Sequence, residues 1–410
     1  MEYILLCCIY VGWLFYNWRV SNDLLAPHQV FGWYWFLQIL IIVPACGFTM
    51  WKYDGLLYIF LCVVAFSTGF LFLHSKVRKP EVHFYRHISV SLLRGIIFFT
   101  GLGIIAHIFS IFELYELSIQ DGVFHISTIS DKLYSLRTHG GEKSSFLSKA
   151  SLILLYAYPL LTGYYYRELK NKLFTIVGLL LILYVSLLLG TKALFITSVL
   201  LWISGWLVST AERGSEYKIK WVNILVSVIG IFIILFISTY IRNYGISGNT
   251  IVNALGYTRN LFFYYTFAHL LAFDNWFFDY VWEIFTWGQY TFFGIFNTLG
   301  LAHREVGIFR EVSYIGLLRT NVYTVFRSII TDFSPFGGWV FMAVWGLIAS
   351  IAYKKVRFSV EASPLAVTIC VVVYAFILWS FVTSIFAYAS YICAFVYFYL
   401  CQKVIIWSSR

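Results

Sequence analysis

The residues best suited to chemistry in this 410-residue chain lie between positions 241 and 320, where arginines and carboxylates interrupt an apolar sequence. An arginine guanidinium carries a planar fork of N–H donors that matches the oxygens of phosphate or carboxylate groups. Equal numbers of both charges argue against a general polyanion surface and indicate a local site for an anionic ligand. The arginines are Arg242, Arg259, Arg304, Arg310 and Arg319, and the acids are Asp274, Asp279, Glu283, Glu305 and Glu311.

The composition predicts the scaffold that must position these residues. Hydrophobic residues make up 60% of the chain and charged residues only 12%, which excludes a soluble globule and indicates an all-α polytopic membrane protein. The net charge of +10 is dispersed among the connections between apolar runs, so it does not indicate a nucleic-acid binder.

About eleven apolar runs have the length of a transmembrane helix. They leave no room for a separate soluble domain, so residues 1–410 form a single integral membrane domain. The expected spans are 2–18, 28–50, 54–74, 88–112, 147–166, 173–190, 192–210, 219–240, 336–353, 363–382 and 385–404.

The connections between these spans differ in charge. When the spans are threaded alternately, the Lys- and Arg-rich connections all fall on one side, which the positive-inside rule assigns to the cytoplasm. The N-terminus is then outside and the C-terminus inside. Two long connections, 113–146 and 241–335, are external. Aromatic stretches at Leu261–Phe273 and Trp276–Phe296 predict short interfacial helices in the second, although re-entrant pieces would leave the topology unchanged.

Three charged residues outside the large connection are also candidates for binding. Lys192 lies between two apolar runs without a neighbouring acid, so it either anchors to lipid headgroups or contacts phosphate. Glu113 and Glu116 are expected to share a helical face at the outer end of the fourth span, which makes them the best candidates for a metal site. No second acidic cluster matches this pair, so we expect no metal and no cofactor.

A C-terminal pattern resembles a known family. Asn321-Val322-Tyr323-Thr324, then Asp332-Phe333 and Gly337-Gly338, stand before an apolar span that closes on Lys354-Lys355. This pattern resembles the O-antigen polymerase family, the Wzy-type oligosaccharide repeat-unit polymerases. Weaker likenesses are the Asp23–Pro27 stretch, Gly190-Thr191-Lys192 and Ile241-Arg242-Asn243.

The resemblance implies a glycosyltransferase of the bacterial inner (cytoplasmic) membrane with a GT-C-like architecture. Such an enzyme works on the periplasmic side and joins undecaprenyl-pyrophosphate-linked repeat units into O-antigen or a related surface polysaccharide. A chain-length regulator and a flippase are the expected membrane partners. The pyrophosphate-binding residues would be Lys192, Arg242, Arg259, Arg304, Arg310 and Arg319. Lys192 departs from the arginine that related enzymes often carry there, and it loses the bidentate fork.

Glycosyl transfer also needs a base that takes the proton of the acceptor hydroxyl. We expect Glu305 in this role, ahead of Asp332 and His303. Asp332 could instead cap a turn, and His303 could be structural. Asn321 and Tyr323 are candidates for hydrogen bonds to sugar, with capping or interface anchoring as the alternative.

Two other functions remain open from the sequence. A lipid A core ligase would use the same donor on the same side of the membrane with a different acceptor. A flippase or other transporter of lipid-linked oligosaccharide normally buries its functional charges at mid-membrane depth. The expected spans are nearly free of charge at their centres, which favours chemistry at the surface.

Overall fold

We analysed the chain in a computed structural model. It describes residues 1–73, 89–118, 120, 126–138, 145–169, 171–214, 230, 233, 236–237, 256, 267–281, 285–302, 309, 311, 313–315, 318–359 and 361–408.

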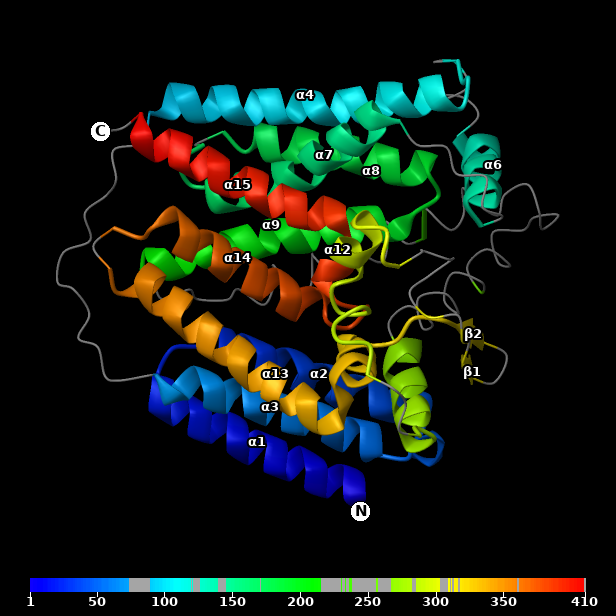
Figure 1. Cartoon of the computed structure of the whole chain (residues 1–410), viewed down its shortest axis with the longest axis vertical. Coiled ribbons are helices and arrows are strands. Elements are labelled where there is room, and N and C mark those ends of the chain that lie inside the picture. Colours follow the sequence, from blue (N-terminus) through cyan, green and yellow to red (C-terminus); the bar gives the residue numbers. More distant parts are fainter. Residues whose placement is uncertain are drawn as a thin grey trace. The chain divides into compact units, whose positions relative to one another are not determined.

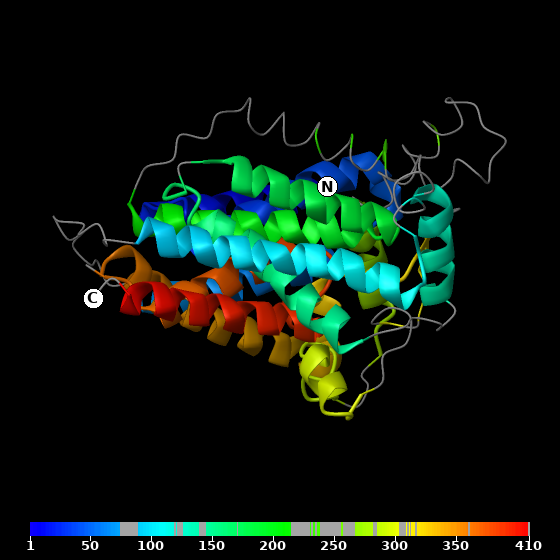
Figure 2. The same cartoon turned by 90° about the horizontal axis from the view of Figure 1, so that it is seen from above.

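The protein is an all-α polytopic membrane protein (Figure 1, Figure 2). Eight helices of the described part are long and apolar enough to cross a membrane: α1 (Glu2–Ser21), α2 (Pro27–Cys46), α3 (Asp54–Phe72), α4 (Val90–Leu114), α7 (Phe146–Tyr164), α9 (Lys192–Glu212), α13 (Val325–Arg357) and α15 (Ala389–Trp407). Two shorter apolar helices are α8 (Leu173–Leu188) and α14 (Pro364–Trp379).

These ten helices coincide with ten of the eleven expected spans, and the expected span 219–240 lies mostly outside the described residues. The remaining elements are short. They are the 3₁₀ helices η1 (Phe48–Met50) and η2 (Ile385–Ala387), the helices α6 (Ile126–Thr138) and α12 (Phe293–Thr298), and the strands β1 (Ser313–Ile315) and β2 (Leu318–Thr320). A further helical stretch covers 267–278.

Local signals in the sequence explain where several helices begin. Ser89, Ser145 and Ser363 each precede a helix and accept a hydrogen bond from the backbone N–H three residues later. Pro27 and Pro364 occupy the first helical position, where no N–H is needed.

The chain divides into two compact units. Unit 1 comprises Met1–His87, Leu207–Gly214 and Thr266–Phe395, and unit 2 comprises Ile88–Trp206, Ser215–Tyr265 and Val396–Arg410. In unit 1 the most extensive helix packing is between α3 and α13. Two glycines allow it, because a Cβ on Gly69 would meet the Ala343 carbonyl oxygen at 2.0 Å and one on Gly346 would meet that of Phe66 at 2.1 Å. Such small residues let membrane helices approach closely.

Several helices of unit 1 finish at one common end. Asp23, two residues after α1, pairs with Arg357 at the end of α13, and Arg357 donates to the carbonyl of Ala211 at the end of α9. Near the end of α3, the ring of Phe70 packs on Tyr353. We call this the basic end, because α1 and α13 finish there with Arg19, Lys354, Lys355 and Arg357. The charge pattern predicted that these residues share a side.

The opposite end of unit 1 contains the described residues of the large connection from 267 onward. There α13 begins at Val325, well before the expected start of its span at 336, and its first turns pack in the core. Phe326 is fully buried, with ring contacts to Trp35 of α2, Tyr58 of α3 and Phe273. We call this the distal end.

Candidate functional site at the distal end

The clearest candidate for ligand binding is a buried guanidinium in the first turn of α13. Arg327 follows Phe326 and is only 4% exposed, although it carries a permanent charge. A fully charged side chain is costly to bury unless other groups stabilise it. The surroundings of Arg327 therefore decide what this residue can do.

Three aromatic rings surround the guanidinium. The Arg327 Cζ atom lies 3.9 Å from the ring centroid of Tyr323, 4.1 Å from Phe309 and 4.8 Å from Trp276. Tyr290 extends the group, since its ring stacks on Phe309 at 5.2 Å. A desolvated cation–π contact contributes about 2 kcal/mol, so the rings offset part of the burial cost. We call Trp276, Phe309 and Tyr323 around Arg327 the Arg327 cage.

Hydrogen bonding leaves the guanidinium incompletely satisfied. Its Nη2 atom donates to Oε2 of Glu311. The Nε and Nη1 atoms are buried and have no hydrogen-bond partner among the described residues. Buried donors are nearly always paired, so two nitrogens of one cation without a partner in the described part of the chain indicate a place for an anionic ligand.

A β-hairpin brings Glu311 back to the cage. Strands β1 and β2 pair in antiparallel fashion, with Ser313 opposite Thr320. The residues that flank the hairpin, Glu311 and Tyr323, consequently lie near each other, and the Tyr323 hydroxyl donates to the Glu311 carbonyl at 3.4 Å. Burial raises the pKa of Tyr323, while the adjacent Arg327 cation opposes this rise.

Asp332 holds a turn against the start of α13. Its side chain is fully buried and accepts three hydrogen bonds, from the Thr286 hydroxyl at 2.5 Å, the Tyr290 N–H at 3.0 Å and the Thr291 N–H at 2.6 Å. Asp332 was a candidate for the base. These contacts favour the alternative, a positioning role, because both oxygens are engaged and Tyr290 is part of the aromatic group at the cage.

A second buried carboxylate fastens the other side of the site. Asp274 accepts backbone N–H groups from Lys52 at 2.7 Å, Tyr53 at 3.1 Å, Gly55 at 2.9 Å and Leu56 at 3.4 Å. These donors lie at the start of α3, where a helix has unpaired N–H groups. Burial raises the pKa of Asp274, and the four N–H groups oppose that rise. The contact fixes the 267–278 helix, and with it Trp276, to the membrane helices.

The same 267–278 helix contains a buried histidine. His269 is 2% exposed, and its Nε2 atom lies 2.9 Å from Oε1 of Gln38 in α2. Burial lowers the pKa of His269 to about 3, so the ring is neutral at ordinary pH. Residues 268 and 270–273 are buried as well, so the first half of this helix packs on the protein.

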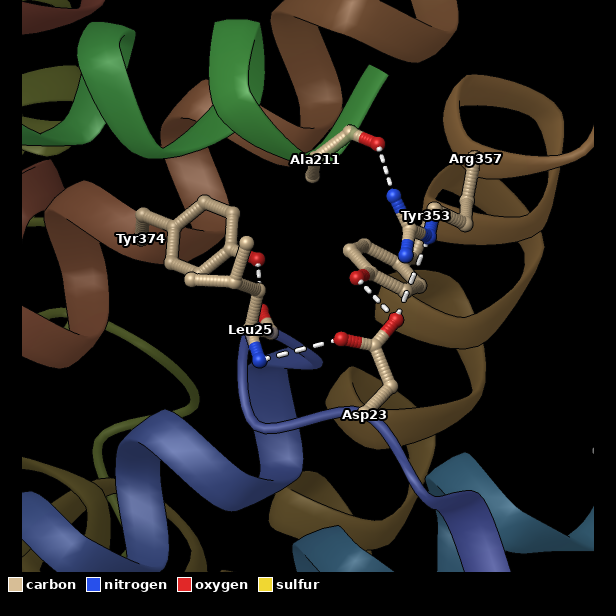
Figure 3. Close-up of polar contacts among 6 residues, drawn as sticks. All are labelled: Asp23, Leu25, Ala211, Tyr353, Arg357 and Tyr374. Atoms are coloured by element: carbon tan, nitrogen blue, oxygen red, sulfur yellow. Dashed lines mark hydrogen bonds and ion pairs between the residues drawn. The ribbon is translucent and has the colours of Figure 1, made fainter. Parts of the chain in front are cut away.

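The basic end holds a different charged cluster (Figure 3). Arg357 Nε lies 3.3 Å from Oδ2 of Asp23, which also accepts from the Tyr353 hydroxyl at 2.7 Å. The other carboxylate oxygen accepts the Leu25 N–H at 3.1 Å, and Arg357 Nη1 donates to the Ala211 carbonyl at 2.9 Å. Asp23 and Arg357 therefore satisfy each other and their neighbours. This cluster joins α1, α9 and α13 and is structural.

The other predicted site residues have different outcomes. Lys192 begins α9 in unit 2 and is partly exposed, and Asn321 is partly exposed just after β2. Arg319 lies in β2 opposite Tyr314, and its side chain is outside the described part. The remaining predicted residues also fall outside the described part: Arg242, Arg259, His303, Arg304, Glu305 and Arg310.

The expectation that Glu113 and Glu116 share a helical face is wrong. Helix α4 ends at Leu114, and Glu116 has a left-handed backbone with φ 53°. The Leu117 N–H bonds the Phe112 carbonyl, which closes the helix end and turns the chain away. Within the described residues there is no group of three or more His, Cys, Asp or Glu side chains that could hold a metal ion.

Arg327 was not among the predicted site residues. The signal for it is a single cation within the otherwise apolar sequence Val325-Phe326-Arg327-Ser328-Ile329-Ile330. Ionisable residues in apolar helices of membrane proteins usually mark functional positions. Tyr323 of the cage is near Arg327 in the sequence, but the other two rings come from positions 276 and 309, and nothing near Arg327 identifies them.

None of the protein-family models, curated proteins or solved structures compared with this chain matches it. The geometry of the site must therefore carry any functional argument.

Proposed function

We propose that this protein is a bacterial inner-membrane glycosyltransferase that polymerises undecaprenyl-pyrophosphate-linked oligosaccharide repeat units on the periplasmic side. The product would be O-antigen or a related surface polysaccharide. The observation that carries the proposal is the Arg327 cage, where a buried cation lies among aromatic rings and two of its nitrogens have no partner among the described residues. A lipid-linked sugar pyrophosphate carries both matching groups, an anion for the guanidinium and sugar faces for the rings.

The arrangement of charges in unit 1 supports a periplasmic site. The basic end collects Arg19, Lys354 and Lys355, which the positive-inside rule places in the cytoplasm. The Arg327 cage lies at the opposite, distal end. Reporter fusions should then give a cytoplasmic signal near residue 79 and a periplasmic signal within 241–320, and an external signal at residue 79 would contradict this orientation.

The residues of the site have distinct proposed roles. Arg327 would hold the pyrophosphate together with cations of the same connection, of which Arg310 stands in the chain between Phe309 and Glu311. Glu305 remains our candidate for the base that activates the acceptor hydroxyl, since it adjoins Arg304. Asn321 and Tyr323 would contact sugar.

Deletion of the gene followed by electrophoresis of the surface glycan tests the function. A polymerase mutant retains glycan with a single repeat unit on its core. A ligase mutant, like a flippase mutant, loses the capped form altogether, so this result would refute the proposed reaction.

Complementation with substituted genes tests the site. Arg327→Lys keeps the charge and loses the bidentate fork, and we expect it to lower polymerisation at least about tenfold. Arg19→Lys is the matched control, because Arg19 also packs on an aromatic ring, with its Cζ 5.4 Å from the Phe15 centroid, yet it is exposed at the basic end. A normal ladder of glycan lengths with Arg327→Lys would remove the cage from the proposal.

A further inference from the structure

The contact between Glu311 and Arg327 uses only part of each group. A carboxylate and a guanidinium can form two parallel hydrogen bonds, whereas Glu311 engages Nη2 through Oε2 alone. Nη2 belongs to both edges of the guanidinium fork. Nη2 carries one N–H on each edge, so its single hydrogen bond to Glu311 occupies one donor of one edge. The second donor of each edge, Nε or Nη1, has no partner in the described part of the chain.

The two partners also differ in how firmly they are held. The Arg327 side chain is 5% exposed and lies inside the aromatic cage, whereas the Glu311 side chain is 66% exposed. Glu311 can leave for water without losing burial of its own, while withdrawal of Arg327 would break its ring contacts. Without Glu311 the buried guanidinium lacks a counter-charge, so its departure is favourable only when another anion takes its place.

We propose that Glu311 occupies Arg327 only while the site is empty, and that a phosphate-class anion displaces it on binding. This inference rests on the proposed function, under which the anion is the pyrophosphate of the lipid-linked substrate. Two oxygens of a phosphate group can accept from Nη2 and from the neighbouring unpaired donor, Nε or Nη1, at the same time. Glu311 does not adopt this bidentate arrangement. Glu311 then acts as an internal competitor that keeps the buried cation neutralised between substrates.

The exchange can be measured by equilibrium binding to the purified full-length protein in detergent, without any glycan. Titration calorimetry with inorganic pyrophosphate and with a short-chain isoprenyl diphosphate provides the two probes. Glu311→Gln removes the competing charge from an exposed position, so we expect about threefold to tenfold tighter binding of both probes. Arg327→Lys should bind at least about tenfold more weakly.

Glu2→Gln is the matched control, because Glu2 is an exposed glutamate in the first turn of α1 in the same unit. It makes the same change in net charge and should leave the affinity unchanged. Equal tightening by Glu2→Gln would show a general charge effect and overturn the exchange. Unchanged affinity in Glu311→Gln would overturn it as well.

A third arm separates the possible sources of phosphate. Nanodiscs rich in phosphatidylglycerol present phosphodiester headgroups at high density, and we expect them to compete poorly with the diphosphate. Competition as strong as that of the isoprenyl diphosphate would reassign the site to bulk lipid headgroups. Failure of polymerisation alone leaves these binding results intact, so the two proposals fail separately.

Discussion

Replacement of Asp332 by Asn tests whether this carboxylate positions the site or takes part in the reaction. The carboxylate is buried and accepts from the Thr286 hydroxyl and from the N–H groups of Tyr290 and Thr291. The Asn side chain retains one acceptor oxygen, which can serve Thr286 and Tyr290. Its amide nitrogen then faces the Thr291 N–H, and two donors oppose each other.

The expected cost follows from these contacts. A buried N–H without a partner costs about 1–3 kcal/mol, and the retained bonds lose their charge assistance, so Asp332→Asn should lower the free energy of unfolding by roughly 2–4 kcal/mol. Thr286→Val removes one donor and should cost about 1 kcal/mol. Asp279→Asn is the control, because Asp279 is exposed, and it should leave stability unchanged.

The assay combines thermal unfolding in detergent with polymerisation per folded molecule. In a positioning role, stability falls in the order Asp279→Asn, Thr286→Val, Asp332→Asn, and activity falls with the folded fraction. A fully stable Asp332→Asn variant with at least about a hundredfold loss of turnover would refute this reasoning and restore Asp332 as a candidate base.

Three further predictions concern other buried or acidic residues. Arg357→Leu leaves the partly exposed Asp23 without its cation, so it should cost at most about 3 kcal/mol in chemical denaturation, and the added Asp23→Leu change should recover much of this loss. The pKa of His269 is lowered to about 3 from its ordinary value near 6.5, so protons bind the unfolded chain more readily and stability falls as the pH drops below 6.5. The loss at pH 5 should be about 2 kcal/mol and should disappear in His269→Gln, as thermal unfolding at both pH values would show. Chelator-treated enzyme should keep its activity; loss with recovery on added magnesium or manganese would bring Glu113 and Glu116 back as metal ligands.

The spans could be predicted because their signal is local. A run of about 20 apolar residues identifies a membrane helix without knowledge of its neighbours, and ten expected spans have a helix in the described residues. Helix ends are set by single residues, which explains the error at Glu116. The shared face required the helix to continue through Glu116, whereas α4 ends at Leu114 and Glu116 has a left-handed backbone.

The candidate site was harder to predict because its contacts join distant parts of the sequence. Asp274 bonds backbone groups at the start of α3, and Arg327 meets rings from positions 276 and 309. The sequence points to the large connection through its arginines, and Arg327 lies within the same segment, 241–335. Burial of Arg327 depends on long-range packing, which the composition of that segment does not reveal.

A break near the start of α13 explains how this membrane helix binds part of the large connection. Ser334 has φ 70° and ψ 169°, a backbone conformation that costs about 1–3 kcal/mol for a residue with a side chain. Pro335 follows and has no N–H, so the helix cannot satisfy the Thr331 carbonyl in the usual way. Helix α3 also contacts the break, since the Tyr58 hydroxyl donates to the Pro335 carbonyl at 3.0 Å.

The segment that precedes α12 donates hydrogen bonds to the carbonyls at the break in α13. The Thr286 hydroxyl donates to the Thr331 carbonyl at 3.4 Å, and the Trp287 N–H donates to the Asp332 carbonyl at 3.3 Å. The break in α13 thus exposes acceptors that the turn at 286–291 uses, and the Asp332 side chain adds its own. Tyr290 of this turn bonds Asp332 through its N–H and stacks on Phe309 of the Arg327 cage. The strained kink therefore fixes the position of the cage relative to α13.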